Sequence, residues 1–207
     1  MIKEVLDKYC YKSEKHNYDI IYGKDFEKLR TLPINILEIG VDYGESIQAW
    51  LEYFPNATVY TIDIFRRVAY WDIPVLQDPR VVWSVCDSTS NKAKNLWSDV
   101  KFDIIIDDGL HTSTAIRNTF LNFFDKLKVG GAYYVEDVIQ YNIITPRDRF
   151  KGSYLEYHRD EFYAKYGSIE KYNIMLETFR KKGKRVFIYD LREMSQCIDS
   201  CIIKITK

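Results

Sequence analysis

Short runs of β-branched and other apolar residues alternate with longer stretches of mixed polarity along this chain of 207 residues. Such runs predict buried strands, and strands that alternate with helical stretches are typical of a parallel α/β sheet. A short polar segment joins the last two strands and is compatible with a hairpin, which predicts one antiparallel strand near the C-terminus of a doubly wound sheet. The seven predicted strands are residues 35–39, 58–63, 81–86, 102–107, 132–136, 185–189 and 200–205.

Helical periodicity fills most of the spaces between these strands. The first thirty residues carry apolar side chains at helical spacing and predict a helical cap segment over residues 1–30, with a second helical stretch near 25–29. We found no internal repeat or low-complexity linker, so we expect a single domain over residues 1–207, with the sheet core in 31–207 and an insertion at about 140–171. Further helices are predicted over 46–53, 91–97, 112–127 and 154–181, with an irregular stretch near 144–152.

The overall charge excludes one class of partner. Formal net charge is zero, with 30 basic and 30 acidic side chains, whereas nucleic-acid binding needs an excess of clustered Lys and Arg. The basic run over 180–185 is interpreted as a solvated helix end and turn. No apolar run is long enough for a membrane span, and the N-terminus lacks the apolar core of a signal peptide. We therefore expect no nucleic-acid partner, no membrane contact and a cytoplasmic location.

The four cysteines predict neither a disulfide framework nor a redox motif. They stand at positions 10, 86, 197 and 201 and form no CxxC pair. Cys197 and Cys201 would make half of a metal site, but the spacing offers no second half. We therefore interpret all four as ordinary thiols in a reducing compartment.

Glycines or acidic residues follow each of the first five predicted strands. Ligands of an open parallel sheet bind outside the carboxyl ends of the strands, where the strand order reverses. The sequence therefore predicts that these residues converge on one binding site. In chain order they are Gly40 and Gly44, Asp63, Asp87 and Ser88, Asp107 and Asp108, and Glu136 and Asp137.

The first strand-end loop, within residues 37–44, predicts a nucleoside-binding site. Glycines let the backbone approach a ligand closely, and an acid at the end of the second strand, Asp63, can accept both ribose hydroxyls. A nicotinamide dinucleotide is the rival ligand, but its GxGxxG pattern is broken by Asp42 and Glu45. These acids would repel a pyrophosphate and suit a cationic sulfonium, which favours S-adenosylmethionine.

A second group of residues predicts metal-assisted chemistry. Asp108, Glu136 and Asp137 offer hard oxygen ligands suited to Mg²⁺, which can hold two adjacent hydroxyls and lower the pKa of one. His111 would stand beside that hydroxyl as general base. In the alternative interpretation, His111 is a helix-start residue without a chemical role, and the Glu136–Asp137 pair caps a helix.

At these residues the chain resembles the class I S-adenosylmethionine-dependent methyltransferases, which have a Rossmann-like sheet. Within them it is similar to the metal-dependent sugar O-methyltransferases of macrolide biosynthesis, the macrocin and mycinamicin type. The resemblance implies Mg²⁺ ligands at Asp108, Glu136 and Asp137, with His111 as the base. The segments that carry it are residues 37–41, 53–57, 107–111, 130–131 and 136–137. The implied cofactor contacts are Glu38, Gly40, Tyr43, Gly44, Ser46, Asp63, Asp87, Ser88 and Asp107.

The resemblance extends to the N-terminal segment. Lys8, His16, Tyr18 and Tyr22 resemble residues of a segment that closes over the active site, although packing explains the two tyrosines equally well. Asp42 departs from the family pattern, since it replaces a glycine common in these cofactor loops. Relatives of this type are often multimeric, which makes a homo-oligomer possible.

The resulting hypothesis is a cytoplasmic, Mg²⁺-assisted O-methyltransferase that acts on a hydroxyl of a sugar or sugar-containing small molecule. The N-terminal thirty residues and the insertion at about 140–171 would build the acceptor pocket. Three alternatives remain at this stage. They are an O-methyltransferase for catechols or phenols, an enzyme that modifies small molecules in another way with an adenosine cofactor, and a non-catalytic interaction subunit with a methyltransferase fold.

Overall fold

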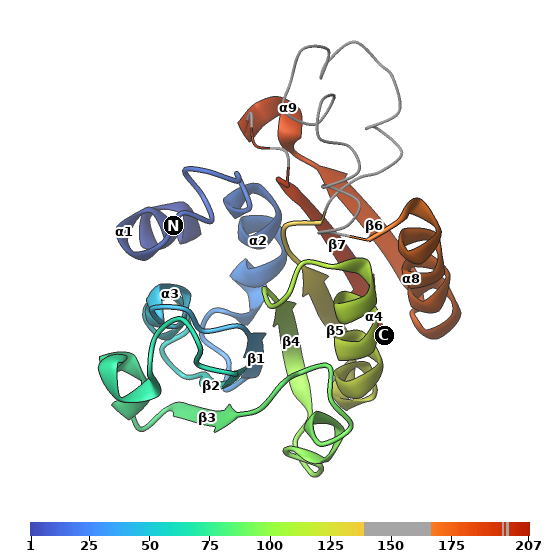
Figure 1. Cartoon of the computed structure of the whole chain (residues 1–207). Helices are drawn as coiled ribbons and strands as arrows, with labels where there is room; N and C mark the ends of the chain where they lie inside the picture. Colours follow the sequence, from blue (N-terminus) through green and yellow to red (C-terminus); the bar gives the residue numbers. More distant parts are fainter. Residues whose placement is uncertain (139–166, 196, 198) are drawn as a thin grey trace.

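A seven-stranded sheet runs through the middle of the protein in the order β3-β2-β1-β4-β5-β7-β6 (Figure 1). The computed structural model describes residues 1–138, 167–195, 197 and 199–207. Strand β7 is antiparallel to both of its neighbours, and the other pairs are parallel, which confirms the predicted architecture. The strands are β1 Asn35–Ile39, β2 Thr58–Asp63, β3 Val81–Val85, β4 Phe102–Asp107, β5 Leu127–Val135, β6 Arg185–Asp190 and β7 Cys201–Thr206.

The central strands are apolar on both faces, and the two faces have separate cores. In β4, Ile104 and Ile106 belong to one cluster of buried residues, whereas Ile105 between them belongs to the other. Because successive side chains of a strand point to opposite faces, a continuous run of isoleucines can serve both cores. This explains why the central strands show uninterrupted apolar runs in the sequence.

Helices cover both faces of the sheet (Figure 1). One core holds residues of α1, α2 and α3, and the other holds residues of α4 and α8. On the first face, Tyr22 and Phe26 of α2 pack against Trp50 of α3 and Tyr134 of β5, with ring centroids 5.3–6.0 Å apart. The helices are α1 Ile2–Tyr9, α2 Asp19–Phe26, α3 Glu45–Tyr53, α4 Ser113–Phe123, α8 Ile169–Lys182 and the short α9 Arg192–Ser195.

The strand order reverses between β1 and β4. From β1 the chain proceeds outward to β2 and β3, and it then returns to place β4 on the other side of β1. This is the switch point at which ligands bind in open parallel sheets. The loops that follow β1, β4 and β5 therefore share one edge of the sheet.

Two predicted elements differ from the structure. The helix expected over 91–97 is reduced to a 3-10 helix at Ala93–Asn95, because side chains of the preceding turn bond to its own backbone and Trp97 has a left-handed φ of +50°. The fifth strand begins at Leu127 rather than at 132 and includes Gly130 and Gly131, with an irregular register against β4. These glycines lie within a bent strand and not before it.

Parts of the predicted layout lie outside the described residues. This applies to the irregular stretch near 144–152 and to most of the insertion at about 140–171. Of the helix expected over 154–181, the described portion is α8. The N-terminal helices are present as expected, and the second starts earlier, at Asp19. Within the described ranges, no helix has both the length and the apolar composition needed to cross a membrane.

Candidate active site

The loop after β1 is built on left-handed backbone conformations. Gly40 has φ +94° and Gly44 has φ +78°. A Cβ atom on Gly40 would lie 2.3 Å from the carbonyl oxygen of Asp108, so the loop packs directly on the loop after β4. Asp42 has φ +46°, a conformation that glycine adopts most easily and that aspartate tolerates. The aspartate at this position therefore keeps the backbone shape that a glycine would give.

Asp63 at the end of β2 fastens this loop. Its Oδ2 accepts a hydrogen bond from the Val41 amide at 2.7 Å, and its Oδ1 accepts one from the Phe65 amide at 2.6 Å. A carboxylate has about four lone-pair sites, so capacity remains for two ligand hydroxyls. Asp63 is half-buried and lies beside the glycine loop, as the sequence predicted for a ribose-binding acid.

Glu38 and Asp107 are carboxyl groups buried at the ends of β1 and β4. Burial raises the pKa of Glu38 to about 7, against the opposing effect of the nearby Lys12 ammonium. Burial likewise raises the pKa of Asp107 to about 7, although the Tyr133 hydroxyl donates to its Oδ2 at 3.0 Å. Trp50 donates to Oε2 of Glu38 at 3.0 Å, while Oε1 accepts no hydrogen bond from the described residues.

The remaining predicted cofactor residues lie in the turn after β3, in the loop after β1 and at the start of α3. Asp87 is exposed and accepts from the amide and hydroxyl of Thr89, and Ser88 bonds to the Thr119 hydroxyl at 2.9 Å. These bonds shape the turn after β3. Tyr43 is exposed at the tip of the loop, and Ser46 stands in the first turn of α3.

The charge of Asp42 is already balanced within the protein. Its Oδ2 accepts from Arg67 at 2.9 Å, and the guanidinium also covers the Tyr43 ring at 5.4 Å. Because both charged side chains are largely exposed, this pair is screened by water. The preference for a cationic ligand therefore depends on Glu38 and Asp63 more than on Asp42.

Three metal-binding side chains meet at the ends of β4 and β5. The ligand atoms of Asp108, His111 and Asp137 all lie within 4.8 Å of one another. Nε2 of His111 is 3.9 Å from Oδ1 of Asp108, and the imidazole is about one-third exposed. His111 immediately precedes Thr112, the N-cap residue of α4, so the helix start fixes where the imidazole lies.

Lys12 occupies the centre of the acidic residues, a role that no sequence motif predicted. Its ammonium donates to Oδ2 of Asp108 at 2.6 Å and to Oε2 of Glu136, and it lies 3.7 Å from Oε1 of Glu38. Burial would lower the pKa of Lys12, but the three carboxylates outweigh it and raise the pKa. The lysine therefore stays charged inside the protein.

Lys12 contacts both acids that follow β4 and β5, but the pKa values of these two acids shift in opposite directions. Burial alone would raise the pKa of Asp108, but Lys12 and His111 reverse this and hold it below its usual value. Glu136 is fully buried, and burial raises its pKa well above the usual value despite Lys12. Because Lys12 and the Tyr22 hydroxyl take both oxygens of Glu136, this carboxyl does not join the group formed by Asp108, His111 and Asp137.

Three of the four predicted N-terminal residues contact the acidic residues. The Tyr18 hydroxyl donates to Oδ1 of Asp137 at 2.6 Å, and Tyr22 donates to Glu136. His16 stacks on Tyr18 and lies with Nδ1 3.6 Å from Oδ1 of Asp137. Lys8 is elsewhere, because it is exposed and pairs with Glu52 at 2.6 Å.

The sequence contains one indication that a buried cation is needed, and it comes from the charge balance of the site and not from a motif. Six acids were predicted after the strand ends at one edge of the sheet, and buried carboxylates need a compensating cation. Such a cation had to come from a lysine or arginine outside the strand-end loops. The sequence offered several candidates in the N-terminal segment, and the resemblance singled out Lys8 instead.

We expect Lys12→Met to destabilise the fold by about 3 kcal/mol or more, because it leaves buried carboxylates without their cation. Urea unfolding at neutral pH measures this loss. The matched control is Lys8→Met, which removes an exposed ion pair and should leave the unfolding midpoint nearly unchanged. Equal midpoints for the two variants would show that Lys12 does not balance the buried charge.

We also expect Glu38→Gln to flatten the dependence of stability on pH. The folded-state pKa of Glu38, about 7, lies above its ordinary value of 4.5, so its contribution is complete below that value and is lost as pH rises through 7. The loss in the unsubstituted protein amounts to at most about 3 kcal/mol. Urea unfolding at about pH 5 and about pH 8 measures it. Exposed Glu45→Gln is the control, and an unchanged slope in Glu38→Gln would refute the assignment.

Comparison with known proteins supports the assignment of the fold. Residues 37–138 match the model of a methyltransferase domain. A tetracenomycin rhamnosyl 2'-O-methyltransferase from Streptomyces olivaceus is 31% identical over 132 residues, which cover 59% of this chain and 33% of that protein. Mycinamicin VI 2''-O-methyltransferase from Micromonospora griseorubida is 29% identical over 126 residues, covering 56% and 30%. The chain thus spans about a third of the length of these curated relatives.

Solved structures share the whole architecture. The MycE methyltransferase of the mycinamycin biosynthetic pathway, in complex with Mg and SAH, superposes with a TM-score of 0.69 at 19% identity, covering 100% of this chain and 54% of that chain. A candidate caffeoyl-CoA O-methyltransferase from Staphylococcus aureus gives a TM-score of 0.65 at 18% identity, covering 99% and 92%. The sequence match and the shared fold agree: residues 37–138 match the methyltransferase domain model, and the whole chain has the fold of these solved structures.

Proposed function

We propose that this protein transfers the methyl group of S-adenosylmethionine to a hydroxyl of a sugar or sugar-containing small molecule, with the help of Mg²⁺. The main support is the meeting of Asp108, His111 and Asp137 at the switch point, directly against the glycine loop after β1. The names of relatives support the acceptor class, since they methylate sugar hydroxyls of tetracenomycin and mycinamicin.

The residues around the glycine loop fit the proposed methyl donor. Gly40 keeps the loop free of a side chain at its closest approach to Asp108, and Asp63 retains acceptor capacity for ribose hydroxyls. Oε1 of Glu38 is buried and lacks a hydrogen-bond donor among the described residues, so it can accept from a cationic ligand. A sulfonium cofactor brings positive charge and no phosphate, which matches these acceptors.

The donor set also fits a divalent cation. Asp108 and Asp137 offer carboxylate oxygens beside the imidazole of His111, and oxygen ligands are those that Mg²⁺ prefers. An Mg²⁺ ion bound there would supply Lewis acidity that lowers the pKa of an acceptor hydroxyl. In our proposal Asp108, Asp137 and Glu136 would hold this ion, and Oε2 of Glu136 would then exchange its contact with the Lys12 ammonium for the ion.

His111 is the proposed general base. It stands at the rim of the acidic residues with a partly exposed imidazole, so it can reach a bound hydroxyl. As the acceptor oxygen attacks the methyl carbon, an O–C bond forms, the C–S bond breaks and the hydroxyl proton passes to His111. Asp108 then stabilises the imidazolium from 3.9 Å. The N-terminal tyrosines hold Asp137 and Glu136 in place during this step.

A second candidate function is methylation of a catechol or phenol. It is favoured by the Staphylococcus aureus structure, a candidate caffeoyl-CoA O-methyltransferase of which this chain covers 92%. The same cation and base would serve either acceptor, since both present adjacent hydroxyls. The acceptor therefore has to be identified by experiment.

We expect the protein to form S-adenosylhomocysteine from S-adenosylmethionine when methyl α-L-rhamnopyranoside is the acceptor. Catechol, tested in parallel, represents the second candidate. Turnover with catechol and none with the sugar would replace the sugar assignment. Absence of S-adenosylmethionine binding in isothermal titration would instead favour a non-catalytic interaction subunit.

Chelation tests the metal. EDTA should abolish methyl transfer and added Mg²⁺ should restore it, because the carboxylates need the ion to orient and activate the hydroxyl. Asp137→Asn should raise the Mg²⁺ concentration required for half-maximal rate, whereas the exposed control Asp99→Asn should not. Full activity in EDTA would exclude the ion from the reaction.

His111→Ala should lower the rate of methyl transfer by roughly 10² or more while S-adenosylmethionine still binds, because the variant lacks the group that takes the proton. Single-turnover rates and isothermal titration separate these two effects. Unchanged turnover would remove His111 from the mechanism. A parallel loss of cofactor binding would assign it a structural role at the start of α4.

A further inference from the structure

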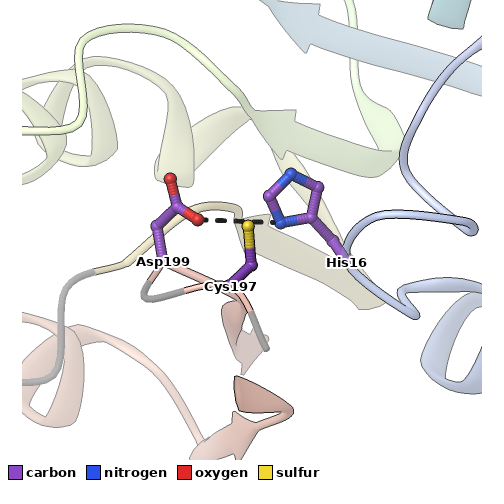
Figure 2. A group of neighbouring side chains, drawn as sticks. All are labelled: His16, Cys197 and Asp199. Carbon is purple, nitrogen blue, oxygen red and sulfur yellow. Dashed lines mark ion pairs between the residues drawn. The ribbon is translucent and has the colours of Figure 1, made fainter. Parts of the chain in front are cut away.

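A second group of metal-binding side chains lies beside the proposed active site and combines the two ends of the chain (Figure 2). It consists of His16, from the segment between α1 and α2, and of Cys197 and Asp199, from the segment between α9 and β7. The imidazole nitrogen, the thiol sulfur and a carboxylate oxygen all lie within 4.8 Å of one another. Figure 2 shows the three side chains pointing toward a common centre.

The chemistry of these donors differs from that of the group at Asp108. Nitrogen, sulfur and carboxylate oxygen together are typical of Zn²⁺ sites, whereas Mg²⁺ prefers oxygen ligands. The two groups share no residue, although Nδ1 of His16 lies 3.6 Å from Oδ1 of Asp137. A thiolate ligand would therefore distinguish this site from the proposed Mg²⁺ site.

A carboxylate oxygen of Asp199 lacks a hydrogen-bond donor in the part of the chain that the structure describes, and a cation could take the place of that donor. Oδ1 of Asp199 is enclosed by protein and accepts no hydrogen bond from the described residues. It faces Nδ1 of His16 at 3.9 Å, and His16 is only 6% exposed. Leaving a buried carboxylate oxygen without a donor or cation is costly. A cation between these side chains would remove that cost.

We propose that His16, Cys197 and Asp199 bind one Zn²⁺ ion, with a water molecule as the fourth ligand. On binding, the S–H bond of Cys197 breaks, its proton leaves to solvent and a Zn–S bond forms. Nδ1 of His16 now bonds to the Ser200 hydroxyl at 2.9 Å and exchanges this contact for the metal. The donor atoms must also draw closer together, since Zn–N and Zn–S distances are about 2.0 and 2.3 Å.

Such an ion would fasten the N-terminal segment to the last strand of the sheet. His16 stacks on Tyr18, which in turn bonds to Asp137, so the zinc site and the acidic residues share a support. From the sequence, Cys197 is interpreted as an ordinary thiol, and the proposed site would instead join it to His16 and Asp199. Cys201 is fully buried in β7 and takes no part.

Cobalt(II) titration of the metal-free full-length chain tests this site. Thiolate–cobalt coordination gives a near-ultraviolet charge-transfer band that oxygen and nitrogen ligands do not give, so the group at Asp108 is silent. We expect one band per chain that saturates at one equivalent and disappears when Zn²⁺ competes. Cys197→Ser should abolish it, whereas Cys86→Ser, Cys10→Ser and Asp108→Asn should keep it.

A second measurement avoids substitution altogether. Zn²⁺ should slow alkylation of Cys197 by iodoacetamide at least tenfold in the unmodified protein and leave Cys86 unaffected, as read by peptide mass spectrometry. The proposal fails if no charge-transfer band forms, if the band survives in Cys197→Ser, or if Zn²⁺ protects Cys10 and not Cys197. Because none of these readouts depends on methyl transfer, they are independent of the proposed function.

Discussion

The positive charge of Lys12 is the interaction on which the rest of the site depends. The ends of β1, β4 and β5 bring Glu38, Asp108 and Glu136 to one buried place, where carboxylates cannot remain ionised without a cation. One ammonium group, reaching in from the segment between α1 and α2, meets all three. The sheet topology therefore gathers negative charge at this place, and Lys12 compensates it.

This charge compensation explains why the N-terminal segment is part of the site and not an appendage. The same stretch that supplies Lys12 also supplies Tyr18 and Tyr22, whose hydroxyls hold Asp137 and Glu136. Tyr22 is at once a core residue, packed between α3 and β5, and a hydrogen-bond donor to the site. Packing and function are therefore not alternatives for these tyrosines, since the apolar ring packs in the core and the hydroxyl bonds to the site.

The sequence predicted the parts of the molecule that depend on local pattern. Six of the strands began within one residue of the predicted start because runs such as 102–107 are apolar on both faces, and the strand-end rule placed Asp63 and Asp108 at one edge of the sheet. It failed where long-range geometry decides. The fifth strand includes Gly130 because its backbone bends there, and Lys12 is buried only because distant acids surround it. The homo-oligomer and the cytoplasmic location remain predictions.

The second group of metal-binding side chains, His16, Cys197 and Asp199, shows the same limitation of sequence analysis. Cys197 has no neighbour in sequence that would complete a metal motif, whereas the fold brings His16 to it from the other end of the chain. Spacing rules detect sites whose ligands lie on one loop or one helix. A site whose ligands come from both ends of the chain can be recognised only when the fold shows that those ends lie together.

The contact between Gly40 and the Asp108 carbonyl has a consequence for exchanging parts among relatives. No carbon atom fits between the loop after β1 and the loop after β4, so each loop is the template for the other. A chimera that takes one loop from a different family member inherits a mismatched partner, even when every side chain of the site is retained. A chimera within this architecture should therefore take both loops from the same parent protein, while the segments outside them are free to vary.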